Sequence, residues 1–111
     1  IEEDGYYGPK TKAGLVRGLQ TELNEQFKRG IAVDGDFGPA TKNACINVRY
    51  NATGNITYII QAMLYVKGYN TNGVEGIFGK GTVSAVRKFQ TDNGLSIDGV
   101  VGKNTFEKLF E

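Results

Sequence analysis

The 111-residue chain contains 13 Lys and Arg, 12 Asp and Glu, one cysteine and no histidine, and 40% of its residues are apolar. This length and apolar content predict one domain, or two very small ones with a shared core, and the near balance of charge argues against a nucleic-acid or anionic-membrane partner. The absence of histidine removes the commonest zinc ligand and general base, so neither a zinc amidase nor a Ser–His or Cys–His nucleophile can be assembled from this chain.

One eight-residue phrase occurs four times, as DGYYGPKT (4–11), DGDFGPAT (34–41), EGIFGKGT (75–82) and DGVVGKNT (98–105). Its acid is suited to accept hydrogen bonds from the backbone of a turn, and the glycine after the acid suits a position with positive φ. The second glycine precedes proline in two phrases, which fits the first position of a helix. Each phrase therefore predicts a loop that ends by starting a helix. The acids and second glycines of this turn motif are Asp4, Gly8, Asp34, Gly38, Glu75, Gly79, Asp98 and Gly102.

Helical periodicity follows every phrase, and one further helix has no phrase ahead of it. Asn55 is the predicted N-cap of that further helix, and Gly68 and Gly94 are predicted to end helices. Strand signals are minimal, so the predicted fold class is all-α. The predicted helices run from Thr11 to about Arg29, from Thr41 through Ala44 and Cys45 to Val48, from Asn55 to Gly68, from Thr82 to Gly94 and from Thr105 to Phe110.

A glutamine directly follows a core residue in three of the predicted helices, as Gln20, Gln61 and Gln90. Loop amides that are buried in a fold must find hydrogen-bond partners. We therefore interpret each glutamine as a side chain that reaches from its helix to the backbone of a neighbouring loop.

The phrases divide the chain into two small helical units. Residues 55–111 form a three-helix unit, and residues 1–50 form an irregular two-helix unit that lacks a leading helix, with the polar stretch 49–55 as the boundary. Two alignments of the units are possible, and we prefer the one that matches LVRGLQ (15–20) with AVRKFQ (85–90), because it keeps the order of the phrases. So small a first unit is expected to lean on the second unit, on an upstream part or on a second copy of the chain.

The stretch GVEGIFGKGTVSAVRKFQTDNGLSIDGVVGKNTFEKLF (73–110) resembles the peptidoglycan-binding domain family, three-helix modules of bacterial and phage cell-wall hydrolases. The two units together resemble the C-terminal region of autolysins and phage endolysins that act on Gram-positive walls. The departures are Phe106, where the family often has Trp, and Glu75, where Asp is usual. The resemblance implies binding of wall glycan or stem peptide, and an upstream catalytic domain such as an N-acetylmuramoyl-L-alanine amidase or a muramidase.

The resemblance also implies that the protein is secreted or released by a phage and acts at the cell wall, although the N-terminal IEEDGYYG is not a signal peptide. We interpret the module as non-catalytic, without cofactor or metal. The pair Asp34 and Asp36 hints at calcium, but the equivalent middle positions of the other phrases (Tyr6, Ile77 and Val100) offer no carboxylate. The phrase acids are interpreted as loop formers rather than ligand contacts or paired catalytic carboxylates.

The candidate ligand site is a shallow groove lined by Tyr65, Tyr69, Asn72 and Arg87. Sugar rings pack on aromatic faces, and stem peptides offer carboxylates and amides to cations and amide donors. The alternative is that these tyrosines only cover a small core.

The alternative function is that of a structural or interaction domain that mediates dimerisation, including homodimerisation, or docks on its own catalytic domain.

Overall fold

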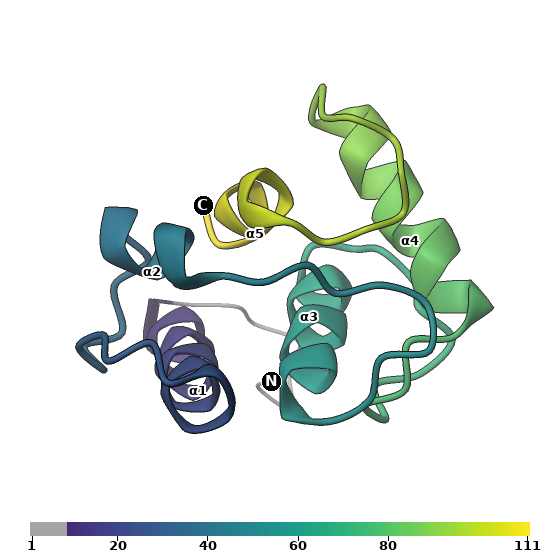
Figure 1. The fold of residues 1–111 in the computed structure, drawn as a ribbon. Coiled ribbons are helices and arrows are strands. Elements are labelled where there is room, and N and C mark those ends of the chain that lie inside the picture. Colours follow the sequence, from purple (N-terminus) through teal and green to yellow (C-terminus); the bar gives the residue numbers. More distant parts are fainter. Residues whose placement is uncertain (1–8) are drawn as a thin grey trace.

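The computed structural model describes residues 9–111, so the first phrase acid and glycine, Asp4 and Gly8, lie outside the described residues. The described part contains five α-helices and no strand longer than an isolated bridge, which confirms the all-α prediction. The helices are α1 (Pro9–Phe27), α2 (Pro39–Ala44), α3 (Asn55–Val66), α4 (Lys80–Asp92) and α5 (Lys103–Leu109) (Figure 1).

Three of these helices begin directly after the second glycine of a phrase. Gly38, Gly79 and Gly102 are the N-cap residues of α2, α4 and α5, and all three have an extended backbone. Pro39 is the first residue of α2, where the N–H that proline lacks has no intrahelical partner to lose. Each of these three phrases therefore sets the point at which its loop turns into a helix.

The second helix is shorter than the sequence predicts. The prediction extends it to Val48, but α2 ends at Ala44. Cys45 has an extended backbone with φ −65° and ψ 149°, and Val48 pairs with Val101 instead of continuing the helix. The prediction was wrong here because a long-range pairing outweighs the local apolar spacing.

The start of α3 also differs from the prediction. Gly54 is the N-cap with φ 113°, and Asn55 is the first helical residue, so the prediction of Asn55 as N-cap was wrong. The Asn55 side chain instead donates a hydrogen bond to the carboxylate of Glu22 on α1 at 2.9 Å. The predicted helix stops Gly68 and Gly94 have φ 91° and 68°, and each lies within two residues of the helix end.

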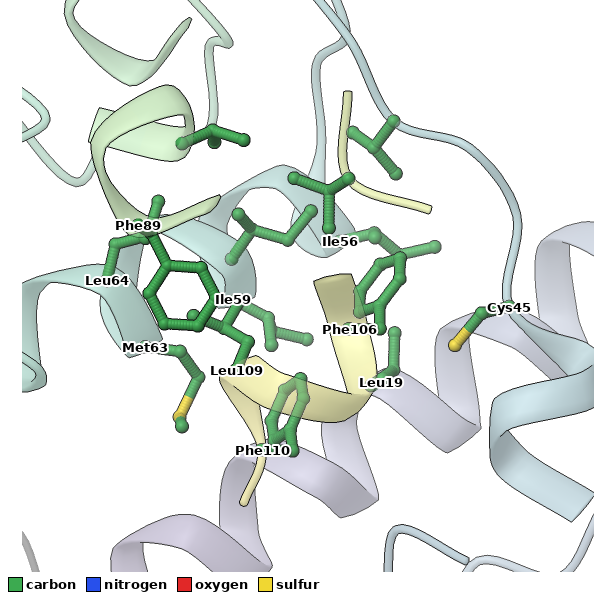
Figure 2. Packing of buried hydrophobic residues seen from close by; sticks show 14 of the residues in the cluster. Leu19, Cys45, Ile56, Ile59, Met63, Leu64, Phe89, Phe106, Leu109 and Phe110 are labelled. Carbon is green, nitrogen blue, oxygen red and sulfur yellow. The ribbon is translucent and has the colours of Figure 1, made fainter. Parts of the chain in front are cut away.

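The buried apolar side chains form one continuous core. Leu19 of α1, Ile59 of α3, Phe89 of α4 and Phe106 of α5 belong to the same cluster (Figure 2). The Cα radius of gyration is 12.8 Å, close to the ~13 Å of a single compact domain of this length. The two predicted units therefore share one core, and their division near residue 50 stays a prediction.

The first half of the chain is supported by the second half. Helix α1 packs on α3, and α2 packs on α5. The ring of Phe37 stacks on that of Phe110 with centroids 5.3 Å apart, and Lys42 forms an ion pair with Glu107 at 3.0 Å. The first unit was expected to lean on the second unit, on an upstream part or on a second copy of the chain. The structure shows that it leans on the second unit.

The connection between α2 and α3 pairs with two of the phrase loops and crosses the molecule in Figure 1. Val48 and Val101 exchange both backbone hydrogen bonds, at 3.0 and 2.8 Å. Thr53 forms a second antiparallel bridge with Ile77. The connection is therefore held against the loops that start α4 and α5.

Candidate functional site

The glutamine of α4 binds both ends of the last phrase. Gln90 Oε1 accepts hydrogen bonds from the backbone N–H groups of Asp98 at 3.2 Å and Gly99 at 3.1 Å. Its Nε2 lies 2.9 Å from Asp98 Oδ1, 2.9 Å from the carbonyl oxygen of Val100 and 3.2 Å from Thr105 Oγ1. We call this arrangement, in which one buried glutamine bonds the acid, glycine and threonine of a phrase, a glutamine clasp.

The same arrangement occurs twice more. Gln20 binds the phrase at 34–41, and Gln61 binds the phrase at 75–82, with all distances between 2.8 and 3.2 Å. The three glutamine side chains are at most 1% exposed. The prediction that each glutamine bonds the backbone of a neighbouring loop is confirmed.

The spacing within the clasps relates the helices to one another. Gln20 and Gln61 both precede their phrase acid by 14 residues and their phrase threonine by 21 residues, whereas Gln90 precedes its partners by 8 and 15 residues. These hydrogen bonds favour the match of α1 with α3. This is the second of the two alignments that the sequence allows, not the one that we preferred.

The two aspartates at the acid position of the described phrases accept backbone hydrogen bonds within their own turns. Asp34 Oδ1 accepts from the N–H of Asp36 at 3.0 Å, and Asp98 Oδ1 accepts from the N–H of Val100 at 2.9 Å. These bonds first, and the glutamine amides second, hold the pKa of both carboxyls below the usual range. Among the described residues, no buried side-chain nitrogen or oxygen lacks a hydrogen-bond partner, so the clasps carry no unsatisfied group for a ligand to fill.

Two tyrosines at the end of α3 lie together on the surface. The Tyr65 side chain is 58% exposed. The Tyr69 hydroxyl donates to Asp92 Oδ2 at 2.7 Å, which raises the pKa of Tyr69, and the Tyr69 ring meets Phe89 edge-on. One tyrosine is therefore fixed and the other is open to solvent. They border a pocket of about 200 Å³ lined by Tyr65, Gly68, Tyr69 and Asn70.

The other two residues predicted for the groove do not line this pocket. A Cβ added to Gly81 would lie 2.7 Å from Asn72 Nδ2, so Asn72 packs over the first turn of α4. A Cβ on Gly99 would lie 3.3 Å from Arg87 Nε, so Arg87 packs over the last phrase loop. The structure brings the two tyrosines together with Asn70 rather than with Asn72 and Arg87. As ligand contacts, the four predicted residues stay a prediction.

A larger pocket of about 500 Å³ lies beside the last phrase, and the sequence analysis missed it. Three segments form its walls: the connection at 47–49, the loop at 95–100 and the start of α5. A local motif does not show that residues 47–49 lie beside the last phrase, so the sequence offers no signal for this pocket. The polar side chains around it belong to Asn47, Arg49, Gln90, Ser96, Asp98, Lys103, Asn104 and Thr105.

The only cysteine of the chain, Cys45, lies in the core with 3% of its surface exposed, as predicted. Burial raises the pKa of its thiol to about 12, so it is protonated and unreactive at neutral pH. Over residues 9–111, no group of three His, Cys, Asp or Glu side chains is placed to hold a metal ion. In the same range, no helix combines the length and the apolar character that crossing a bilayer requires.

Comparison with known proteins identifies relatives of the whole chain. It is 42% identical to "Uncharacterized protein FadG" of Bacillus subtilis over 98% of its length, and 34% identical to the N-acetylmuramoyl-L-alanine amidase CwlL of Bacillus licheniformis over 96%. The chain spans 19% of FadG and 36% of CwlL. The crystal structure of the SleB N-terminal domain superposes with a TM-score of 0.56 and 36% identity, over 58% of this chain and 88% of that domain.

A family model matches the second half of the chain. Residues 53–109, just over half of the chain, match the model described as "Putative peptidoglycan binding domain". This range holds α3, α4 and α5 with two of the three clasps. The chain belongs to the peptidoglycan-binding domain family.

Proposed function

We propose that the chain is a non-catalytic module that holds a peptidoglycan hydrolase on its substrate. The observation that carries the proposal is the family match over 53–109. Support comes from CwlL, an N-acetylmuramoyl-L-alanine amidase of which the chain resembles about a third, so that most of that enzyme lies outside the resemblance. The module would act at the cell wall, as part of a secreted or phage-released hydrolase.

The chemistry of the chain supports binding rather than cleavage. The chain has no histidine, and the carboxylates of Asp34 and Asp98 are already engaged by a backbone N–H and a glutamine amide. A general acid needs a proton to give near neutral pH, whereas the pKa of both carboxyls is lowered. These acids therefore serve the loops.

We place the sugar contact at the pocket of Tyr65 and Tyr69. Sugar rings bury well on aromatic faces, and the exposed Tyr65 ring offers such a face beside a tyrosine whose position Asp92 fixes. Asn72 and Arg87 would contact the wall polymer beside the pocket and not inside it. A module that binds a repeating lattice through several weak contacts gains from a high effective concentration of sites.

The test is sedimentation of the 111-residue chain with insoluble, purified Gram-positive walls. We expect the chain to pellet with the walls and the turbidity of the suspension to stay constant. A chain that remains in the supernatant would instead support the alternative of a docking or dimerisation domain, and falling turbidity would show an enzyme. Tyr65→Ala tests the place of contact, with Tyr50→Ala as the control, because Tyr50 is similarly exposed at 49% but lies in the connection between α2 and α3.

A further inference from the structure

We propose that the pocket beside the last phrase binds the terminal carboxylate of a peptidoglycan stem peptide, with Arg49 and Lys103 as its cations. The inference rests on the proposed wall-binding function and identifies the stem peptide as the part of the wall that this second site binds. It is separate from the tyrosine pocket, with which it shares no lining residue.

The first argument is that the fold holds the wall of this pocket in place. Val48 is 4% exposed and exchanges two backbone hydrogen bonds with Val101, at 3.0 and 2.8 Å. Successive side chains of an extended segment point to opposite sides. Since Val48 points into the core, its neighbours Asn47 and Arg49 point outward, and both line the pocket.

The second argument is that the phrase glycine makes room for this wall. A Cβ on Gly102 would lie 2.9 Å from Asn47 Oδ1, closer than real Cβ contacts allow. The absence of a side chain at Gly102 therefore leaves room for the Asn47 amide where it lines the pocket. Lys103 and Asn104, the next two residues, are exposed and line the opposite side of the pocket.

The third argument is the charge of the lining. Arg49 and Lys103 are exposed, and neither takes part in the two ion pairs that the described residues form. An arginine guanidinium binds a carboxylate through two parallel hydrogen bonds, and a lysine adds a point charge. Asp98 also lines the pocket, but its carboxylate is already engaged by the Val100 N–H and the Gln90 amide. A stem peptide carries carboxylates, amides and amines, whereas an N-acetylated glycan strand offers hydroxyl and amide groups, so this lining favours the peptide.

The experiment measures binding of the synthetic peptide L-Ala-γ-D-Glu-L-Lys-D-Ala to the 111-residue chain by NMR titration, with the same peptide as its C-terminal amide for comparison. Arg49→Ala and Lys103→Ala test the two cations. Lys80→Ala is the matched control for Lys103→Ala, because Lys80 is the first residue of α4 after Gly79, as Lys103 is the first residue of α5 after Gly102. Lys88→Ala, exposed on α4, is the control for Arg49→Ala.

We expect saturable shifts at residues 47–49 and 95–105 with the free acid, and roughly tenfold weaker binding for either test variant and for the amide, the usual cost of losing a charged hydrogen bond. The controls should bind as the unaltered chain does. Equal binding of acid and amide, or test variants that bind like their controls, would overturn the inference. If the unaltered chain sediments with walls yet gives no shifts with the peptide, the inference fails while the proposed function stands.

Discussion

The two halves of the molecule use the same clasp, but they connect it differently. In the first half, α1 supplies Gln20, and α2 receives the clasp in the sense that Thr41 on α2 accepts a hydrogen bond from Gln20. In the second half, α3 supplies Gln61, which α4 receives through Thr82, and α4 then supplies Gln90 to the last phrase. Helix α4 therefore both receives and supplies a clasp, whereas α2 only receives one.

Helix length explains this difference. Thr82 and Gln90 lie eight residues apart on α4, a helix of 13 residues. Helix α2 has six residues and ends three residues after Thr41, so it offers no second glutamine position at that spacing. It is supported instead by α5 and its end: Phe37, two residues before α2, stacks on Phe110, the residue after α5. A long helix can extend the series of clasped loops, and a short helix ends it and must be supported from outside.

The largest expected effect is the loss of a clasp. Gln61→Ala removes the partner of the buried Gly76 N–H and of Thr82 Oγ1, and buried groups left without a partner cost ~1–3 kcal/mol each. We expect the free energy of unfolding to fall by about 4 kcal/mol, measured by urea denaturation. Gln20→Ala should cost less, about 3 kcal/mol, because its loop N–H groups are only partly buried.

Gln26→Ala is the control for both clasp variants. Gln26 is exposed and its side chain bonds Glu22 one turn away on the same helix, so its loss should change the free energy of unfolding by less than about 0.5 kcal/mol. Clasp variants that cost no more than this control would show that the clasps do not stabilise the loops.

The next effect tests the contact between the halves. Phe37→Ala removes a half-buried ring stacked on Phe110, and we expect a loss of about 2 kcal/mol in the free energy of unfolding, less than for a fully buried ring. Lys42→Ala, which breaks the ion pair between Lys42 of α2 and Glu107 of α5, should cost less than ~1 kcal/mol because both side chains are partly exposed. If the ion-pair variant is the more damaging one, apolar stacking is not what holds α2.

A smaller effect is expected from a glycine of the central clasp. Gly76 has φ 81°, and an added Cβ would lie 3.2 Å from the carbonyl oxygen of Gly54, so Gly76→Ala should cost about 1–2 kcal/mol. Gly14→Ala in α1 should have the opposite sign and stabilise by ~0.5–1 kcal/mol, because it lies within a helix with nothing inside 4 Å of its added Cβ. Thermal unfolding of the two variants checks both signs, and a shift of the same sign would contradict the account.

The smallest expected effect is a fall in the free energy of unfolding at low pH. It is small because Asp34 and Asp98 both face solvent. The pKa of each is lower in the folded state than the ~3.9 of an unfolded aspartate, so the stabilisation is present above roughly pH 4 and is lost as the pH falls through the folded pKa. Asp98→Asn should therefore flatten the decline in stability below pH 4, measured by urea denaturation across pH. The exposed Glu25→Gln serves as control, and equal slopes for Asp98→Asn and the unaltered chain would contradict the prediction.

Local signals were sufficient to predict most of the helices and the role of the glutamines. The glycine that follows each phrase acid permits the positive φ of the turn, as at Gly35, Gly76 and Gly99. This signal depends only on residues that are close in sequence. Loop amides that are buried in a fold need hydrogen-bond partners, so a glutamine that recurs directly after a core residue can be interpreted as such a partner without knowing the fold.

What the sequence did not show depends on distant segments. Helix α2 ends early because Val48 pairs with Val101, 53 residues away. The polar pocket depends on the same pairing, which brings Arg49 beside the last phrase. Asn72 and Arg87 were grouped with the tyrosines as an amide donor and a cation for the stem peptide. Packing against Gly81 and Gly99 sets them apart, and no local rule predicts such packing.

The most direct test of the central claim, that the chain binds wall polymer and leaves it intact, is a depletion isotherm. The 111-residue chain is mixed with increasing amounts of purified Gram-positive wall, and free protein and turbidity are read from the same samples. The account predicts saturable depletion of free protein at constant turbidity. Free protein that does not fall as wall is added, or turbidity that declines with time, would contradict it.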